Sequence, residues 1–159
     1  MSIPLQLTLP HNLYQDIWAQ AAAERPHECC GLLAGTLEPD AHGIPTAIVR
    51  ARYPLRNAAA SPVRYEGDPA DLCRAHRDLR GRGLLLLAIY HSHPTSPPVP
   101  SRTDLELNFY GDEVLHLIVS LQGGPPEARC WRLGPDAARE VPWALALDTL
   151  PEEPPPRRP

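Results

Sequence analysis

The sequence predicts a single α/β domain in which a mixed central β-sheet is flanked by helices. Its 159 residues are enough for one domain with a sizeable core and too few for two. Hydrophobic residues make up 43% of the chain and charged residues 21%, the balance of an ordinary soluble globular protein. Apolar runs typical of strands alternate with segments of helical periodicity, and this alternation indicates the mixed α/β class.

Two segments carry the signals of a helix. Residues 11–24 place apolar side chains at helical spacing, and Pro26 ends the pattern. The segment 67–83 is the clearest helix in the chain, because Asp68 is suited to cap it, Pro69 fits its first turn and a glycine follows its last turn.

Five strands are expected around these helices. They span residues 29–35, 46–57, 84–91, 114–121 and 128–133. The run LLLLAIYH at 84–91 is apolar almost throughout, which predicts a central strand that is buried on both faces.

The domain is expected to cover residues 1–148, followed by a disordered, proline-rich and charged tail at 149–159. A net charge of −4 without a long basic block argues against a nucleic-acid partner. The start of the chain lacks a signal-peptide pattern and the longest apolar run is far short of a membrane span, so we expect a cytoplasmic protein without a membrane partner. The oligomeric state stays open between monomer and homodimer.

The four cysteines give no sign of a zinc ribbon or a redox dithiol, because none of them forms a C-x-x-C pair. Cys29 and Cys30 would point to opposite faces of a strand, so a bond between them is not expected. We interpret all four as reduced and mostly as core residues. Whether Cys29 or Cys30 lines a functional site stays open.

The segment YHSHPTSPPVPSRTD, residues 90–104, has the composition of a metal site. His91 and His93 end the predicted central strand on the same side, and two imidazole nitrogens at ~2.0–2.1 Å from one ion are ordinary zinc geometry. A catalytic zinc takes three protein ligands, and Asp104 is the nearest candidate for the third. The prolines in between fix their own φ angles and can return the chain to the metal at low entropic cost. On these residues alone, a structural role for the two histidines stays open.

The pair Ser101 and Asp104 has two competing interpretations, and so does Glu28. Ser101 and Asp104 have the spacing of a helix capping box, which predicts a short helix from Ser101 towards Phe109 and conflicts with a carboxylate given to a metal. Glu28 enters a predicted buried strand beside 84–91 and is a candidate proton acceptor for a hydrolysis, although acids at such positions are often simply solvated.

Taken together, Glu28, the His-x-His-Pro at 91–94 and the Ser-x-x-Asp at 101–104 resemble the JAMM (MPN-type) zinc metallopeptidase family, and PHECCGLLAG resembles its prokaryotic branch. The similarity extends over roughly residues 5–135. It implies a cytidine-deaminase-like fold and one Zn²⁺ ion per chain.

The resemblance also implies the role of each residue. His91, His93 and Asp104 would bind the zinc. Glu28 would act as the general base and later return the proton to the leaving amine. Ser101 would hydrogen-bond the tetrahedral intermediate without binding the metal.

The implied substrate is a peptide or isopeptide bond after the C-terminal Gly-Gly of a ubiquitin-like or sulfur-carrier protein, for example in a cysteine adduct. Residues 57–68 are the expected substrate-facing loop. A non-catalytic carrier-binding module of the same fold is the alternative. A RadC-like protein is less favoured because Ser92 replaces the usual Asn, and a deaminase because P-C-x-x-C is missing. His116 is interpreted as having no catalytic role and Trp131 as a packing residue.

Overall fold

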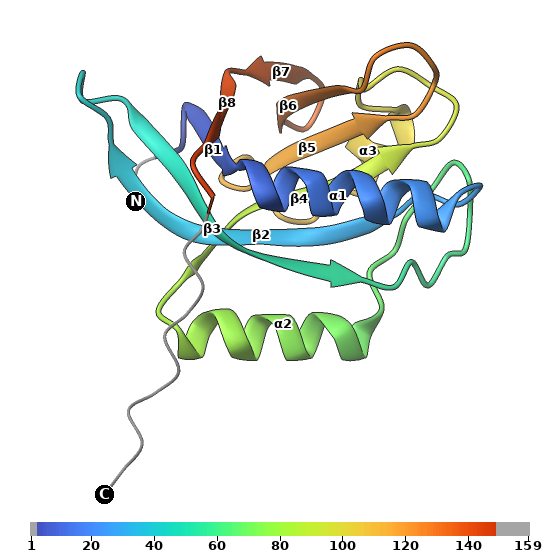
Figure 1. Cartoon of the computed structure of the whole chain (residues 1–159), viewed down its shortest axis with the longest axis horizontal. Coiled ribbons are helices and arrows are strands. Elements are labelled where there is room, and N and C mark those ends of the chain that lie inside the picture. Colours follow the sequence, from blue (N-terminus) through green and yellow to red (C-terminus); the bar gives the residue numbers. More distant parts are fainter. Residues whose placement is uncertain (1–2, 149–159) are drawn as a thin grey trace, which may run out of the picture.

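The computed structural model describes residues 3–148, which form one mixed eight-stranded sheet with a long helix on each face (Figure 1). The predicted mixed α/β fold is therefore confirmed. The elements are β1 (Gln6–Pro10), α1 (His11–Glu24), β2 (Cys30–Pro39), β3 (Pro45–Leu55), α2 (Pro69–Gly81), β4 (Leu85–His93), α3 (Arg102–Glu106), β5 (Leu115–Ser120), β6 (Glu127–Leu133), β7 (Ala138–Val141) and β8 (Trp143–Ala146). The predicted tail, residues 149–159, lies outside the described residues.

The strands lie in the order β7-β6-β5-β4-β2-β3-β1-β8. β4 pairs antiparallel with β2 and parallel with β5, so it sits in the middle of the sheet as its apolar sequence predicts. The register places Cys30 of β2 and Ile118 of β5 on either side of His91. The start of β2 and the C-terminal end of β4 therefore meet at one place, where the polar residues of the sequence motif gather.

Alternation along the strands divides the interior between the two faces of the sheet. Tyr90 packs in the cluster under α1, whereas Ile89 packs in the cluster under α2. Cys29 and Cys30 likewise belong to opposite clusters, and all four cysteines carry free thiols, as predicted.

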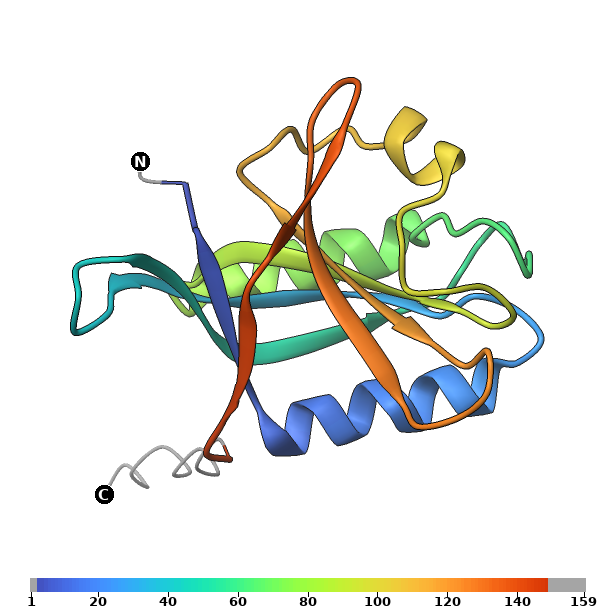
Figure 2. The ribbon, with the colours of Figure 1, turned by 90° about the horizontal axis from the view of Figure 1, so that it is seen from above.

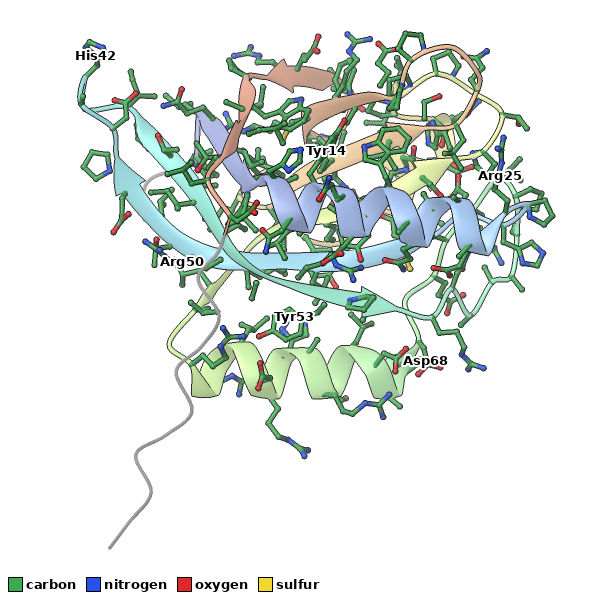
Figure 3. The ribbon with its side chains drawn as sticks, in the orientation of Figure 1. Tyr14, Arg25, His42, Arg50, Tyr53 and Asp68 are labelled. Carbon is green, nitrogen blue, oxygen red and sulfur yellow. The ribbon has the colours of Figure 1, made fainter. Side chains whose placement is uncertain are left out.

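The two long helices follow the sequence signals. α1 begins at His11 directly after β1, and α2 begins at Pro69 with the Asp68 carboxylate accepting a hydrogen bond from the Asp71 N–H at 3.1 Å. Tyr53 of β3 points towards α2 and donates a hydrogen bond to Asp78, which joins this helix to the sheet (Figure 3). Among residues 3–148, no helix has the length and apolar character that a membrane crossing requires.

The third helix is shorter than the sequence predicts. α3 ends at Glu106 instead of running towards Phe109. The reason is local, because the Asn108 side chain accepts a hydrogen bond from the Tyr110 N–H and donates one to the Gly111 carbonyl. Gly111 itself has a φ of 70°, which a helix does not allow.

Three strands escaped the sequence analysis, namely β1, β7 and β8. Each has only four or five residues, and β8 forms one edge of the sheet while β7 forms the other. β1 runs parallel to both β3 and β8, far apart in sequence, and Figure 2 shows it crossing the sheet next to β8. Short edge strands with one half-exposed face carry little periodicity to detect.

Candidate metal centre

The two histidines of the motif lie at the end of β4 and point to the same side of the sheet. Their Nε2 atoms are 3.1 Å apart, and their side chains are 0% and 3% exposed for His91 and His93. The alternation of a strand brings them together, because residues two apart share a face.

Asp104 of α3 completes a group of three donors. Its Oδ2 atom lies 3.3 Å from His91 Nε2 and 3.2 Å from His93 Nε2. Ligands at about 2.05 Å from a tetrahedral zinc ion are about 3.3 Å apart, so the three separations match the edges of one face of that tetrahedron. Two imidazoles and one carboxylate also form the donor set of a catalytic zinc site, and the residues fit this metal.

The capping box around Asp104 is present together with this donor geometry. Ser101 Oγ accepts a hydrogen bond from the Asp104 N–H at 3.0 Å, and Asp104 Oδ2 accepts one from the Ser101 N–H at 2.8 Å. The cap, which was expected to conflict with a metal role for Asp104, leaves its Oδ2 directed at both histidines. A carboxylate oxygen has two lone-pair directions, and one serves the cap while the other faces the imidazoles.

The Nδ1 atoms of the two histidines differ in their hydrogen bonding. His93 Nδ1 lies 2.7 Å from the Pro97 carbonyl oxygen, which can only accept, so Nδ1 carries a proton and Nε2 is the ring nitrogen that faces His91 and Asp104. His91 Nδ1 has no hydrogen-bond partner within the described part of the chain. Its ring stacks on Tyr65 instead, with centroids 4.5 Å apart.

Glu28 brings a second carboxylate to the same place. It lies just before β2, is 3% exposed, and its Oε1 is 4.0 Å from His93 Nε2, while Oε2 has no hydrogen-bond partner among residues 3–148. Glu28, His91 and His93 could thus also hold an ion between them, since their donor atoms lie within 4.8 Å of one another. Asp104 is the nearer carboxylate, which favours it as the third ligand and leaves Glu28 beside the metal position.

Burial and charge set the protonation of these groups. Burial raises the pKa of Glu28 to about 8, partly offset by attraction to His93. For Asp104, the charge and hydrogen bonds of the two histidines outweigh burial and hold its pKa well below the usual range. Burial lowers the pKa of His91, whereas the bonds of His93 to Asp104 and the Pro97 carbonyl outweigh burial and raise its pKa.

The backbone of Glu28 is fixed by the loop that was expected to face the substrate. Its N–H donates to the Ser61 carbonyl at 2.9 Å, and its carbonyl accepts a hydrogen bond from Asn57 Nδ2 at 3.0 Å. Asn57 Oδ1 in turn accepts from the N–H groups of Ala59 and Glu66. Sequence analysis missed Asn57 and the stacked Tyr65, because neither belongs to a spacing pattern, although both lie within the predicted loop 57–68.

An apolar cavity of about 530 Å³ has Asp104, one of the three donors, in its wall. Residues of the segments 64–69 and 103–110 also line it. Apolar side chains from the sheet, from α2 and from the segment after α3 complete the lining: Leu32, Leu55, Leu72, Ile89, Leu107 and Phe109. The arrangement offers a donor group for one metal, an adjacent buried carboxylate and an apolar wall for an extended chain.

Comparison with known proteins identifies the family of the chain. The family described as "Prokaryotic homologs of the JAB domain" matches residues 10–134 of the chain. The chain belongs to this family. The resemblance to the prokaryotic JAMM branch and the fold that it implied are thereby confirmed.

Several curated proteins that are similar in sequence to this JAB-domain chain are named as proteases or peptidases. A "Probable TtuB-protein conjugate cleaving protease" of Thermus thermophilus is 39% identical over 103 residues, which cover 64% of this chain and 63% of that protein. A "Desampylase" of Haloferax volcanii is 42% identical over 54% of this chain and 58% of its own length. The chain thus matches about three fifths of these two relatives. A "CysO-cysteine peptidase" of Mycobacterium tuberculosis is 29% identical over 86% of this chain and 88% of that protein.

A solved structure shares the JAB-domain architecture. The solution structure of a Desulfitobacterium hafniense protein superposes with a TM-score of 0.79 at 30% identity and covers 90% of this chain and 94% of its own.

Proposed function

We propose that the protein is a zinc-dependent metallopeptidase that hydrolyses a peptide or isopeptide bond after the C-terminal Gly-Gly of a ubiquitin-like or sulfur-carrier protein. The observation that carries the proposal is the set of three donor atoms 3.1–3.3 Å apart beside a buried carboxylate with an unpaired oxygen. Bound there, zinc would act as a Lewis acid and would favour ionisation of the attacking water.

His91, His93 and Asp104 are the proposed zinc ligands, one ion per chain. Asp104 remains ionised over the working pH range because its pKa is low, and His93 directs Nε2 towards the metal position because Nδ1 is bonded to a carbonyl. Metal ligation needs an ionised carboxylate and a deprotonated Nε2, so zinc binding would release any proton that Nε2 carries.

Glu28 is the proposed general base. Its Oε2 is buried and unpaired, so this oxygen is available to take a proton from the attacking water and to deliver it to the leaving nitrogen. Burial raises the pKa of Glu28 in the metal-free chain, and a zinc ion beside it would lower that pKa again, so the carboxylate could take the proton from water and release it to the leaving nitrogen.

Ser101 is the proposed stabiliser of the tetrahedral intermediate. Its Oγ accepts the Asp104 N–H, and the hydroxyl proton is left over to be donated to a developing oxyanion. The residue needs no place among the ligands for this role.

The proposed substrate follows from the relatives and from the cavity. One relative is named for TtuB–protein conjugates and another for CysO-cysteine, so conjugates of small carrier proteins are the common theme of those names. An extended C-terminal tail that ends in two glycines has no side chains at the cut, and it can approach Glu28 closely while earlier residues contact the apolar cavity.

Mass spectrometry of a Gly-Gly-ended carrier, extended by cysteine or a short peptide, tests the proposal. The zinc-loaded protein should release the extension after the second glycine. Glu28→Gln should lower the rate by about 10²–10⁴-fold, the usual contribution of a general base, while keeping zinc. Glu38→Gln, a matched change at the exposed far end of β2, should keep the wild-type rate.

A different outcome would favour a different function. If the protein holds zinc and binds the carriers but leaves all of them intact, the carrier-binding module becomes the better proposal. If Glu28→Gln cleaves as fast as the wild type, the assignment of the base is refuted.

A further inference from the structure

The loop between the histidines and Ser101, residues 94–100, is attached to the sheet through its carbonyl groups. Four of its seven residues are prolines, which have no N–H to donate. Three consecutive carbonyls each accept a hydrogen bond from a side chain of the sheet. The bonds are Ser120 Oγ to Ser96 at 2.6 Å, His93 Nδ1 to Pro97 at 2.7 Å and Trp131 Nε1 to Pro98 at 2.9 Å.

The donors come from three neighbouring strands, which are β4 for His93, β5 for Ser120 and β6 for Trp131. Ser120 and Trp131 are 7% and 8% exposed, and the strand pairing holds their backbones in place. Ser96 and Pro97, by contrast, are exposed. This outer part of the loop is held to the sheet by the two side-chain bonds that flank Pro97, and within the loop the Val99 N–H donates to the Pro97 carbonyl at 2.8 Å.

The Pro97 carbonyl is the group that decides how the His93 ring is set. Because it can only accept, it requires a proton on Nδ1 and so directs Nε2 towards His91 and Asp104. Moving this carbonyl by a fraction of an ångström would weaken the bond and free the ring to rotate. Partners of this kind tune the affinity of a metal site without touching the ion.

We propose that Trp131 and Ser120 are positioning residues for the metal centre. By holding the carbonyls on both sides of Pro97, they keep the Pro97 carbonyl bonded to His93 Nδ1–H and the ring oriented. The inference rests on the proposed metal function only for its effect on zinc, since the orientation of the His93 ring is a property of the chain itself.

Trp131 also packs, as the sequence suggested, so its two roles have to be separated. It belongs to a cluster with Ile118 and Leu133, and the Arg129 guanidinium lies 4.6 Å from the centre of its ring. Phenylalanine keeps an aromatic ring in this cluster but cannot donate to Pro98, so Trp131→Phe removes the hydrogen bond with the least change in packing.

The chain contains a matched control. Trp143 also donates its indole N–H to a backbone carbonyl, that of Ala128 at 3.1 Å, but it packs against the core cluster under α1, on the other face of the sheet. Trp143→Phe loses the same kind of bond away from the loop. Ser120→Ala provides a second, smaller change at the other side of Pro97.

Two measurements test the proposal: zinc affinity by competition with a chromophoric chelator, and protection of the His93 Nδ1 proton from exchange with water by NMR of the metal-free protein. Trp131→Phe and Ser120→Ala should weaken zinc binding by about 10- to 100-fold, the range found for supporting groups of a metal site. Both should also speed the exchange of the Nδ1 proton, because its bond to the Pro97 carbonyl is weakened. Trp143→Phe should match the wild type in both measurements.

The inference is overturned if Trp131→Phe and Ser120→Ala keep wild-type protection of the His93 Nδ1 proton together with wild-type zinc affinity. A failure of the proposed function gives a different result. A wild-type protein that binds zinc but cleaves no carrier refutes the substrate, and one that binds no zinc refutes the metal centre, while the NMR measurement still decides whether the loop sets the His93 ring.

Discussion

Ser101 and Asp104 are joined by hydrogen bonds in both directions, and the Asp104 oxygen that closes this pair also faces the two imidazoles. Oδ2 accepts the Ser101 N–H at 2.8 Å and lies 3.2–3.3 Å from the Nε2 atoms of the histidines. The start of α3 and the position of the third donor are therefore one local structure. Substitutions at Ser101 should separate the contribution of the cap from that of the hydroxyl group in catalysis.

Ser101→Ala should lower both stability and activity while keeping zinc. Loss of the Oγ that accepts the Asp104 N–H should cost about 0.5–2 kcal/mol of unfolding free energy, the usual range for a cap. Removing an oxyanion donor should lower kcat by about 10²–10³-fold. Asp68→Ala, which removes the cap of α2, should cost similar stability in urea denaturation with an unchanged kcat. Equal losses of kcat in the two variants would show that Ser101 acts only as a cap.

Zinc should stabilise the folded protein through Asp104 and not through Glu28. Zinc at about 100 times its Kd should add about 2.7 kcal/mol to the unfolding free energy, and a chelator should reverse the gain. Calorimetry or dye-based melting measures the shift. Asp104→Ala should abolish the zinc-induced shift, whereas Glu28→Ala should keep it. The reverse pattern would identify the donor set of Glu28, His91 and His93 as the metal site.

His116 should make the protein less stable in mild acid. Burial lowers its pKa from 6.5 to about 4, and both ring nitrogens lack partners within the described residues. Below pH 6.5 the His116 imidazole takes up a proton in the unfolded chain but not in the folded chain. The unfolding free energy is therefore not reduced by this residue above pH 6.5, and it falls as the pH drops towards 4. The loss amounts to about 3 kcal/mol at most.

Urea denaturation of the metal-free protein across this pH window checks the prediction. His116→Leu should flatten the decline between pH 6.5 and 4. His42→Leu, at the exposed tip of the β2–β3 hairpin, should follow the wild-type curve (Figure 3). A wild-type slope in His116→Leu would assign the acid sensitivity to other groups.

Two glycines should respond to alanine in opposite directions. A Cβ on Gly31 would lie 2.2 Å from the ring of Tyr90, whose hydroxyl bonds Gln20 of α1 at 2.5 Å, so Gly31→Ala should destabilise the protein by about 1–3 kcal/mol or more. A Cβ on Gly81 of α2 meets nothing within 4 Å, and Gly81→Ala should stabilise by about 0.5–1 kcal/mol. Denaturant midpoints of the two variants provide the comparison, and a neutral Gly31→Ala would mean that Tyr90 has room to move.

The parts of the fold that could be predicted are those in which local signals are strong. The cap at Asp68 and Pro69 fixes the start of α2, and the apolar run ending in His91 fixes the central strand. The five residues of the motif meet at one place because strand alternation and a capped turn are local rules. Their roles in catalysis stay a prediction, since the structure supplies their positions only.

The remaining parts depend on contacts between residues distant in sequence. β1 is five residues long and is stabilised by pairing with β8, more than a hundred residues away, which no local pattern reveals. The Asn57 side chain bonds main-chain carbonyl and N–H groups, which every residue type offers, so its partners cannot be recognised from the sequence. Trp131 was expected to pack, and only the position of the Pro98 carbonyl shows what its N–H does.

The loop after β3 is bonded to the backbone of Glu28 at two points, Asn57 and Ser61. Asn57 pairs with Gly67 across the base of the loop, and its side chain bonds the carbonyls of Glu28 and Arg64. Further out, the Ser61 carbonyl accepts the Glu28 N–H at 2.9 Å. A change in the length of residues 58–63 would therefore also shift the segment that carries the Glu28 carboxylate. Evolution of this loop is constrained by the position of that carboxylate, so point substitutions are better tolerated there than insertions.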